Sequence, residues 1–158
     1  MLNTECKQCH KKWHHDNAKY CEMCGKKLVD EPEFKVGDYA VELGKYITKI
    51  EKISEYGIPV GAFYELENNQ FCQSESTVAS YEARHATPEE IAEYESALTF
   101  HKHGRKPFEV KDGDLLENKF GRYTAHEYSF SKEDFTVGGN TLLKTVEEVN
   151  EWLGANDE

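Results

Sequence analysis

The sequence has no long hydrophobic run. Its longest stretches without Asp, Glu, Lys or Arg are nine residues long, as at 56–64, whereas a membrane-spanning helix needs about 20 apolar residues. The first residues, Met-Leu-Asn-Thr-Glu-Cys-Lys, also lack the apolar core of a secretion signal. We therefore expect a soluble, cytoplasmic protein with no membrane partner.

Basic residues are scarce, with 19 Lys and Arg against 30 Asp and Glu and a formal net charge of -11. The shortage is not uniform, because residues 1–29 hold six lysines and only three acidic residues. Residues 29–33, Val-Asp-Glu-Pro-Glu, are polar, acidic and broken by a proline, as linkers between domains commonly are. The sequence thus predicts two units, residues 1–29 and an acidic body at 34–158.

Cysteine is almost absent after residue 24, where only Cys72 occurs. The other four cysteines form two Cys-x-x-Cys pairs separated by eleven residues: Cys6, Cys9, Cys21 and Cys24. Two such pairs on tight turns can present four thiolates to one tetrahedral ion, and Zn²⁺ binds four sulfurs at about 2.3 Å. Metal binding also supplies folding free energy that so short a segment cannot obtain from a hydrophobic core. We predict one structural zinc ion.

Other interpretations of the four cysteines are open. Two disulfides fit the same count, although a reducing compartment disfavours them. Iron in a rubredoxin-like site uses the same four sulfurs, and a thiol redox pair explains one Cys-x-x-Cys but not two. His10, His14 and His15 lie between the pairs and can also bind metals, but four cysteines already complete the coordination shell.

The two pairs resemble the short zinc-ribbon family over about residues 4–29. The aromatic Tyr20 before the third cysteine and the Gly-x-x-Leu run after the fourth are typical of that family. The resemblance implies two zinc knuckles on a small β-hairpin. It departs at His10, where the family's commonest form has glycine after the first pair. Members act as adaptors, nucleic-acid readers and assembly modules, so the resemblance implies zinc and no single activity.

The sequence of the body predicts an α+β fold. Residues 34–86 contain short β-branched and aromatic runs separated by turns, opened by Val-Gly-Asp, which indicates a small SH3-like β-barrel. A helix is predicted at 88–103, because Thr87 is a suitable N-cap, Pro88 fits the first helical position and Glu90 completes a capping box.

Residues 105–158 are predicted to form β-hairpins and a C-terminal helix. The run Lys-Asp-Gly-Asp at 111–114 is a hairpin-turn signal. Thr145 and Glu148 form a second capping box, and helical spacing places Trp152 toward the core.

The sequence offers no catalytic motif. It has no glycine-rich phosphate loop and no serine in a nucleophile elbow. His101 and His103 diverge by about 200° on a helix, and Cys72 in a strand is interpreted as a small buried hydrophobe. We expect no enzyme; a deep cleft with His101 or His126 beside a carboxylate would favour one.

We interpret the chain as a non-enzymatic zinc-containing binding or adaptor protein whose acidic body engages a protein partner. An acidic surface of this kind can also mimic DNA and occupy a basic groove on another protein. The alternative is a nucleic-acid-associated regulator in which the basic segment binds phosphates and bases through Lys11, Lys12, Trp13 and Lys26. The charge of the body disfavours this alternative, because it repels a polyanion.

Residues 86–95 and 104–110 give a second resemblance. Together with the cysteine segment, they resemble uncharacterised accessory proteins of phages and prophages of Gram-positive bacteria. This resemblance implies an origin for the chain and no mechanism.

Overall fold

The computed structural model describes residues 2–3, 5–15, 18, 20–26, 28, 33–79, 82–126 and 129–155. The chain divides into two compact units, residues 1–33 and 34–158. Most of the predicted linker at 29–33 lies outside the described residues.

The first unit contains a minimal antiparallel sheet. β1 (Leu2–Asn3) pairs with β2 (Trp13–His14), with Leu2 opposite His14. Within β2 the side chain of Trp13 is exposed and that of His14 is buried, which is the alternation that a strand imposes. The first cysteine loop lies between β1 and β2 in the sequence, and the second follows β2.

The second unit begins with a six-stranded antiparallel sheet. Its strands are β3 (Tyr39–Glu42), β4 (Tyr46–Lys49), β5 (Lys52–Ile53), β6 (Pro59–Glu65), β7 (Gln70–Thr77) and β8 (Ala83–His85). The central strand β6 pairs with β4, β5 and β7, while β3 pairs with β4 and β8.

The pairings do not close this sheet into the predicted barrel. Among the described strands, β7 pairs only with β6 and β8 only with β3, so no ladder joins the two ends. The described strands form no closed barrel, so the predicted small SH3-like barrel is not confirmed, whereas the prediction of a mixed structure with antiparallel sheets is confirmed.

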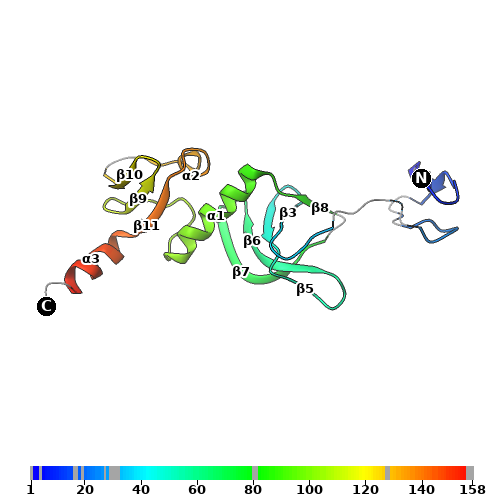
Figure 1. Cartoon of the computed structure of the whole chain (residues 1–158), viewed down its shortest axis with the longest axis horizontal. Helices are drawn as coiled ribbons and strands as arrows, with labels where there is room; N and C mark the ends of the chain where they lie inside the picture. The colour runs from blue at the N-terminus through cyan, green and yellow to red at the C-terminus, as the bar shows by residue number, and fades with distance from the viewer. Residues whose placement is uncertain are drawn as a thin grey trace. The chain divides into compact units, whose positions relative to one another are not determined.

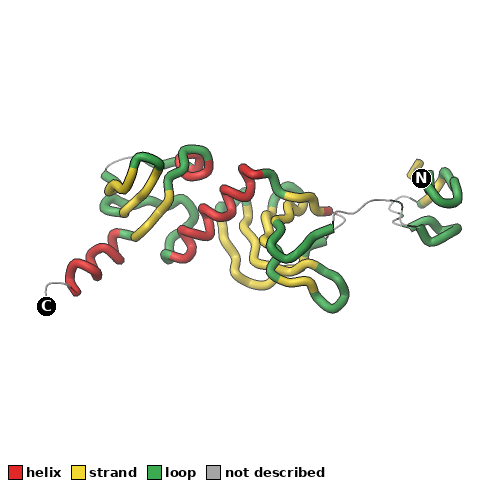
Figure 2. Tube along the Cα trace, viewed as in Figure 1, coloured by secondary structure: helices red, strands yellow, loops and turns green. Residues whose placement is uncertain are grey.

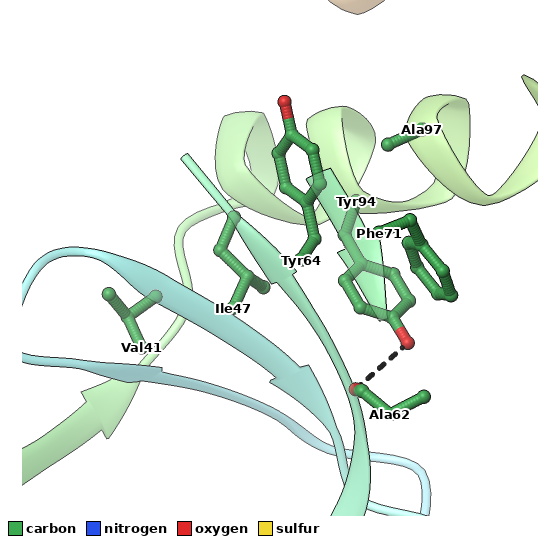
Figure 3. Close-up of a cluster of buried hydrophobic side chains, with 7 residues drawn as sticks. All are labelled: Val41, Ile47, Ala62, Tyr64, Phe71, Tyr94 and Ala97. Carbon is green, nitrogen blue, oxygen red and sulfur yellow. Dashed lines mark hydrogen bonds between the residues drawn. The ribbon is translucent and has the colours of Figure 1, made fainter. Parts of the chain in front are cut away.

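One cross-strand row forms the centre of the first core. Val41, Ile47, Tyr64 and Phe71 lie directly opposite one another on β3, β4, β6 and β7. All four are buried and pack in one cluster with Tyr94 and Ala97 of the helix α1 (Pro88–Lys102) (Figure 3). α1 therefore covers the sheet face that carries this row.

The boundaries of α1 are local properties of the sequence, and their prediction is confirmed. Thr87 accepts the N–H of Glu90 through its side chain, and the Glu90 carboxylate accepts the N–H of Thr87. Pro88 occupies the first helical position, and the helix ends one residue before the predicted 103. Gly104 follows with a φ of 70°, a conformation that favours glycine at a helix end.

A second sheet lies on the other side of α1. It consists of β9 (Leu115–Asn118), β10 (Gly121–Thr124) and β11 (Thr141–Lys144) in the order β10-β9-β11. The helices α2 (Lys132–Thr136) and α3 (Val146–Ala155) precede and follow β11. Its core is Phe100 of α1 with Leu116, Ala125, Phe135 and Leu142. α1 thus serves two cores and lies between two sets of strands (Figure 2).

Two expectations for this region are wrong. The hairpin turn falls between β9 and β10, at residues 119–120, and not at 111–114. Trp152 is 61% exposed and does not belong to the core, because α3 extends past the sheet on which its first turn packs (Figure 1). The capping box of Thr145 and Glu148 is confirmed by both of its hydrogen bonds.

No helix in the described ranges is both long enough and apolar enough to span a bilayer.

Candidate metal centre

The sulfurs of the four N-terminal cysteines converge on one point. The Sγ atoms of Cys6, Cys9, Cys21 and Cys24 all lie within 4.8 Å of one another. The Sγ distances are 3.5 Å from Cys6 to Cys24 and 3.4 Å from Cys9 to Cys21. A tetrahedral ion with metal–sulfur bonds of about 2.3 Å separates its sulfurs by about 3.8 Å. All four are free thiols in this structure, and the group has the size and the donor set of a four-thiolate metal site.

The two cysteine loops have the same backbone pattern. In the first, Cys6 donates its N–H to the carbonyl of Lys11 at 2.9 Å, and His10 donates to the carbonyl of Cys6 at 2.9 Å. In the second, the N–H of Cys21 donates to the carbonyl of Lys26 at 2.7 Å, and that of Gly25 to Cys21 at 2.8 Å. The spacing along the chain is identical, so each pair is presented by the same type of tight loop.

Amide N–H groups from these loops also reach the sulfurs. Backbone N–H groups of Cys9 and Gln8 lower the pKa of Cys6 to about 6. Burial acts to raise the pKa of Cys21, but the N–H groups of Cys24 and Met23 outweigh it, and the net shift is downward. Donors aimed at the first sulfur of each pair favour its thiolate form.

The second sulfur of each pair behaves differently. The N–H of Lys26 acts to lower the pKa of Cys24, yet burial and the three neighbouring sulfurs together raise it to about 12. The pKa of Cys9 is also raised: the amide of Lys11 opposes the shift, and the sulfur of Cys21 and burial outweigh it. Four adjacent sulfurs cannot all ionise without a compensating charge, and a divalent cation supplies that charge.

None of the three histidines near the site contributes a ring nitrogen to the candidate ligand group. His10 contacts Glu5 through Nδ1 at 2.8 Å, and His15 lies 3.5 Å from Glu22. His14 is buried, and its Nε2 lies 3.2 Å from the carbonyl of Lys11. The burial of His14 was not predicted, and the sequence held no signal for it, because alternation in a two-residue strand favours the apolar Trp13 as the buried residue.

The residues proposed for nucleic-acid binding lie on the surface of the same unit. Trp13 is 55% exposed, and Lys12 and Lys26 are exposed. Lys11 is different, because its Nζ donates to the Glu22 carboxylate at 2.9 Å, a contact that links the two cysteine loops. The hydrogen bond to Glu22 raises the pKa of Lys11.

In the body, the histidines do not gather at one site. The ring of His101 packs against Phe71, with centroids 5.0 Å apart, and the described residues that line the adjoining hollow of about 570 Å³ include no carboxylate. His103 binds Glu148 at 2.9 Å. His126 lies 3.5 Å from Asp112, and both side chains are about 70% exposed, so this pair does not form a deep cleft.

Cys72 lies in β7 of the second unit and is only partly buried. It stands opposite Phe63 in the row next to the helix-covered one, which places it on the other face of the sheet.

A search of protein-family models, curated proteins and solved structures found no match to this chain.

Proposed function

We propose that this chain is a zinc-containing adaptor protein, in which a zinc-ribbon head is joined to an acidic body that binds a protein partner without catalysis. The observation that carries the proposal is the convergence of four thiols from two loops of identical backbone pattern. Structural zinc sites use such closed four-sulfur shells, whereas catalytic ones keep a position open for water or substrate. Zinc is favoured over iron because Zn²⁺ has no redox chemistry and therefore suits a site with a purely structural role.

The charge of the body supports a partner with a basic surface. Of the 30 acidic residues, only three occur in residues 1–29. Ion pairs such as Lys52–Glu75 and Lys132–Glu93 neutralise some carboxylates, but the body has far more acids than bases and a surplus remains. A surface with such a surplus accelerates association with a basic partner and repels a nucleic acid.

The test uses the purified full chain. Elemental analysis should find one zinc per chain and no stoichiometric iron. Affinity capture from the native host should retain a protein whose binding weakens as salt increases and persists after nuclease treatment. Purified protein that is metal-free, has intact thiols and does not bind added Zn²⁺ would contradict the zinc assignment. Capture of a partner that depends on nucleic acid would contradict the adaptor assignment.

Nucleic-acid binding by the head is the second candidate, and the exposure of Trp13 beside exposed Lys12 favours it. An exposed aromatic next to cations suits base stacking and phosphate contact. Replacement of Lys12 and Lys26 by Gln in the full chain should then abolish a salt-dependent gel shift. The matched control replaces Lys106 and Lys119, which are lysines of the body, and should leave the shift unchanged.

A further inference from the structure

Three exposed apolar side chains lie at the end of β5 and in the loop that joins it to β6. We call residues 53–58 the hairpin tip. Ile53 is 39% exposed, Tyr56 is 81% exposed and Ile58 is 40% exposed. The loop projects from the sheet next to the label β5, away from the C-terminal end of α1 (Figure 1). Single exposed apolar residues are ordinary on protein surfaces, but here three lie within six residues of the chain.

Hydrogen bonds give the hairpin tip a defined shape. Ser54 donates its N–H to the carbonyl of Ile58 at 2.9 Å and accepts the N–H of Gly57 at 2.9 Å through its own carbonyl. Its hydroxyl also accepts the N–H of Ile58 at 3.1 Å. Below the loop, Ile53 stands opposite Pro59 in the ladder of β5 and β6. A loop closed in this way loses little conformational entropy when it binds.

The three side chains have no evident role in the packing of the body. None of them belongs to a core cluster of the described residues. Tyrosine is among the residue types that most often dominate the energy of protein interfaces. An ordered loop with an exposed tyrosine between two isoleucines therefore has the composition of an interface anchor.

Charges around the hairpin tip indicate what kind of surface it fits. Glu51 and Glu55 are exposed on either side of Ile53. The one lysine in this stretch, Lys52, binds Glu75 at 2.7 Å. The hairpin tip thus combines exposed apolar side chains with neighbouring acidic ones. A second copy of the chain would bring like charges together, because each carries a net charge of -11.

We propose that the hairpin tip is the docking element for the protein partner, and that the partner offers an apolar pocket bordered by lysine or arginine side chains. Tyr56 enters the pocket. Ile53 and Ile58, which the pairing of Ile53 with Pro59 and of Ser54 with Ile58 places on opposite faces of the hairpin, contact the two sides of the pocket, and Glu51 and Glu55 face the basic border. This inference rests on the proposed function, since it names the part of the acidic body that binds.

The test places a photoreactive p-benzoylphenylalanine at position 56 of the full chain in the native host. Phe120 is the matched control position, because it is 86% exposed at the tip of another hairpin and its neighbour Lys119 lies over its ring. The expected result is one protein adduct from position 56, and none from position 120, with the cross-linked partner peptide containing apolar residues and Lys or Arg. An adduct with a second copy, a nuclease-sensitive adduct, equal adducts at both positions, or none would overturn the proposal.

Affinity variants separate this inference from the proposed function. Tyr56→Ala should reduce capture of the partner by about tenfold or more, as truncation of an interface anchor does, while thermal unfolding stays unchanged because the side chain is exposed. Ser54→Ala should weaken capture less, by removing one hydrogen bond of the loop. If Tyr56→Ala captures the partner as well as the wild type, the hairpin tip is not the docking element although the adaptor function stands. If the wild type captures nothing, both fail.

Discussion

His10 and Gly25 occupy equivalent positions in the two cysteine loops. Each follows the second cysteine of its pair, and each donates its N–H to the carbonyl of the first cysteine. Their φ angles are 59° and 71°, in the left-handed region. Glycine adopts this conformation without steric cost, whereas a histidine pays a modest penalty there. The same backbone is therefore strained in the first loop and relaxed in the second.

This equivalence predicts opposite effects for two substitutions. His10→Gly should stabilise the metal-bound head by about 0.5–1 kcal/mol by relieving the left-handed strain. The lost contact with Glu5 is exposed and contributes little. Gly25→Ala should destabilise the head by about 1 kcal/mol, although no heavy atom lies within 4 Å of the added Cβ. Competition with a zinc chelator measures both, and shifts in the same direction would show that the loops are not equivalent.

The four cysteines should be required equally for metal binding. Ser replacement of any one should lower the zinc content from one per chain to near zero, because a hydroxyl is a poor substitute for a thiolate ligand. Hydrogen exchange should accelerate in residues 5–26 and stay unchanged in α1. Cys72→Ser is the matched control and should keep its zinc. Full zinc content in a variant of the four would remove that cysteine from the site.

Tyr94 joins α1 to the sheet through a buried hydrogen bond. Its hydroxyl donates to the carbonyl of Ala62 at 3.1 Å (Figure 3), at the point where the pairing of β6 with β7 shifts register. Tyr94→Phe leaves this carbonyl unpaired and should cost about 1–3 kcal/mol of unfolding free energy. Urea denaturation followed by circular dichroism measures the loss. Tyr56→Phe, at an exposed position, should show none, and an equal loss in both would mean that the bond is not the cause.

Among the polar residues of the body, Asp114 should be the one whose replacement lowers the stability most. Its fully buried carboxylate accepts both terminal nitrogens of Arg105, at 2.9 and 3.2 Å, and the backbone N–H groups of Lys111 and Val146. Asp114→Ala leaves the buried guanidinium with only an exposed partner, Glu147, and should cost about 3–5 kcal/mol. Glu147→Ala should cost much less, because this carboxylate is exposed and solvent screens its ion pairs. Denaturation midpoints that fall equally would contradict this ranking.

The features that sequence predicted well are those set by neighbours in the chain. The cap of α1 at Thr87 and the cap of α3 at Thr145 each depend on a side chain three residues away. The four cysteines were identified by spacing alone. In each case the interacting groups are close in sequence, so the spacing of residue types is enough to predict their geometry.

The features that sequence missed depend on distant partners. Asp114 was placed in a hairpin turn, but Arg105 and the first turn of α3 hold it in the interior. Trp152 has helical spacing suited to a core, yet the sheet beneath α3 ends before it. α2 has five residues, too few for a periodic signal. Whether the strands close into a barrel likewise depends on pairings that no local pattern specifies.

The docking of α3 should weaken in acid through Glu147. Its own backbone N–H and the Arg105 guanidinium, followed by Lys111, hold the pKa of Glu147 at about 2, below its ordinary value of 4.5. A carboxyl whose folded pKa is depressed stabilises the fold above its unfolded pKa, and this contribution is lost as pH falls. Protection of the α3 amides from hydrogen exchange should therefore decrease between about pH 4.5 and pH 2. In Glu147→Gln the protection should be lower near neutral pH and fall less steeply across that range, whereas Glu151→Gln on the same helix should follow the wild type. Parallel profiles for wild type and Glu147→Gln would assign the acid sensitivity to other carboxylates.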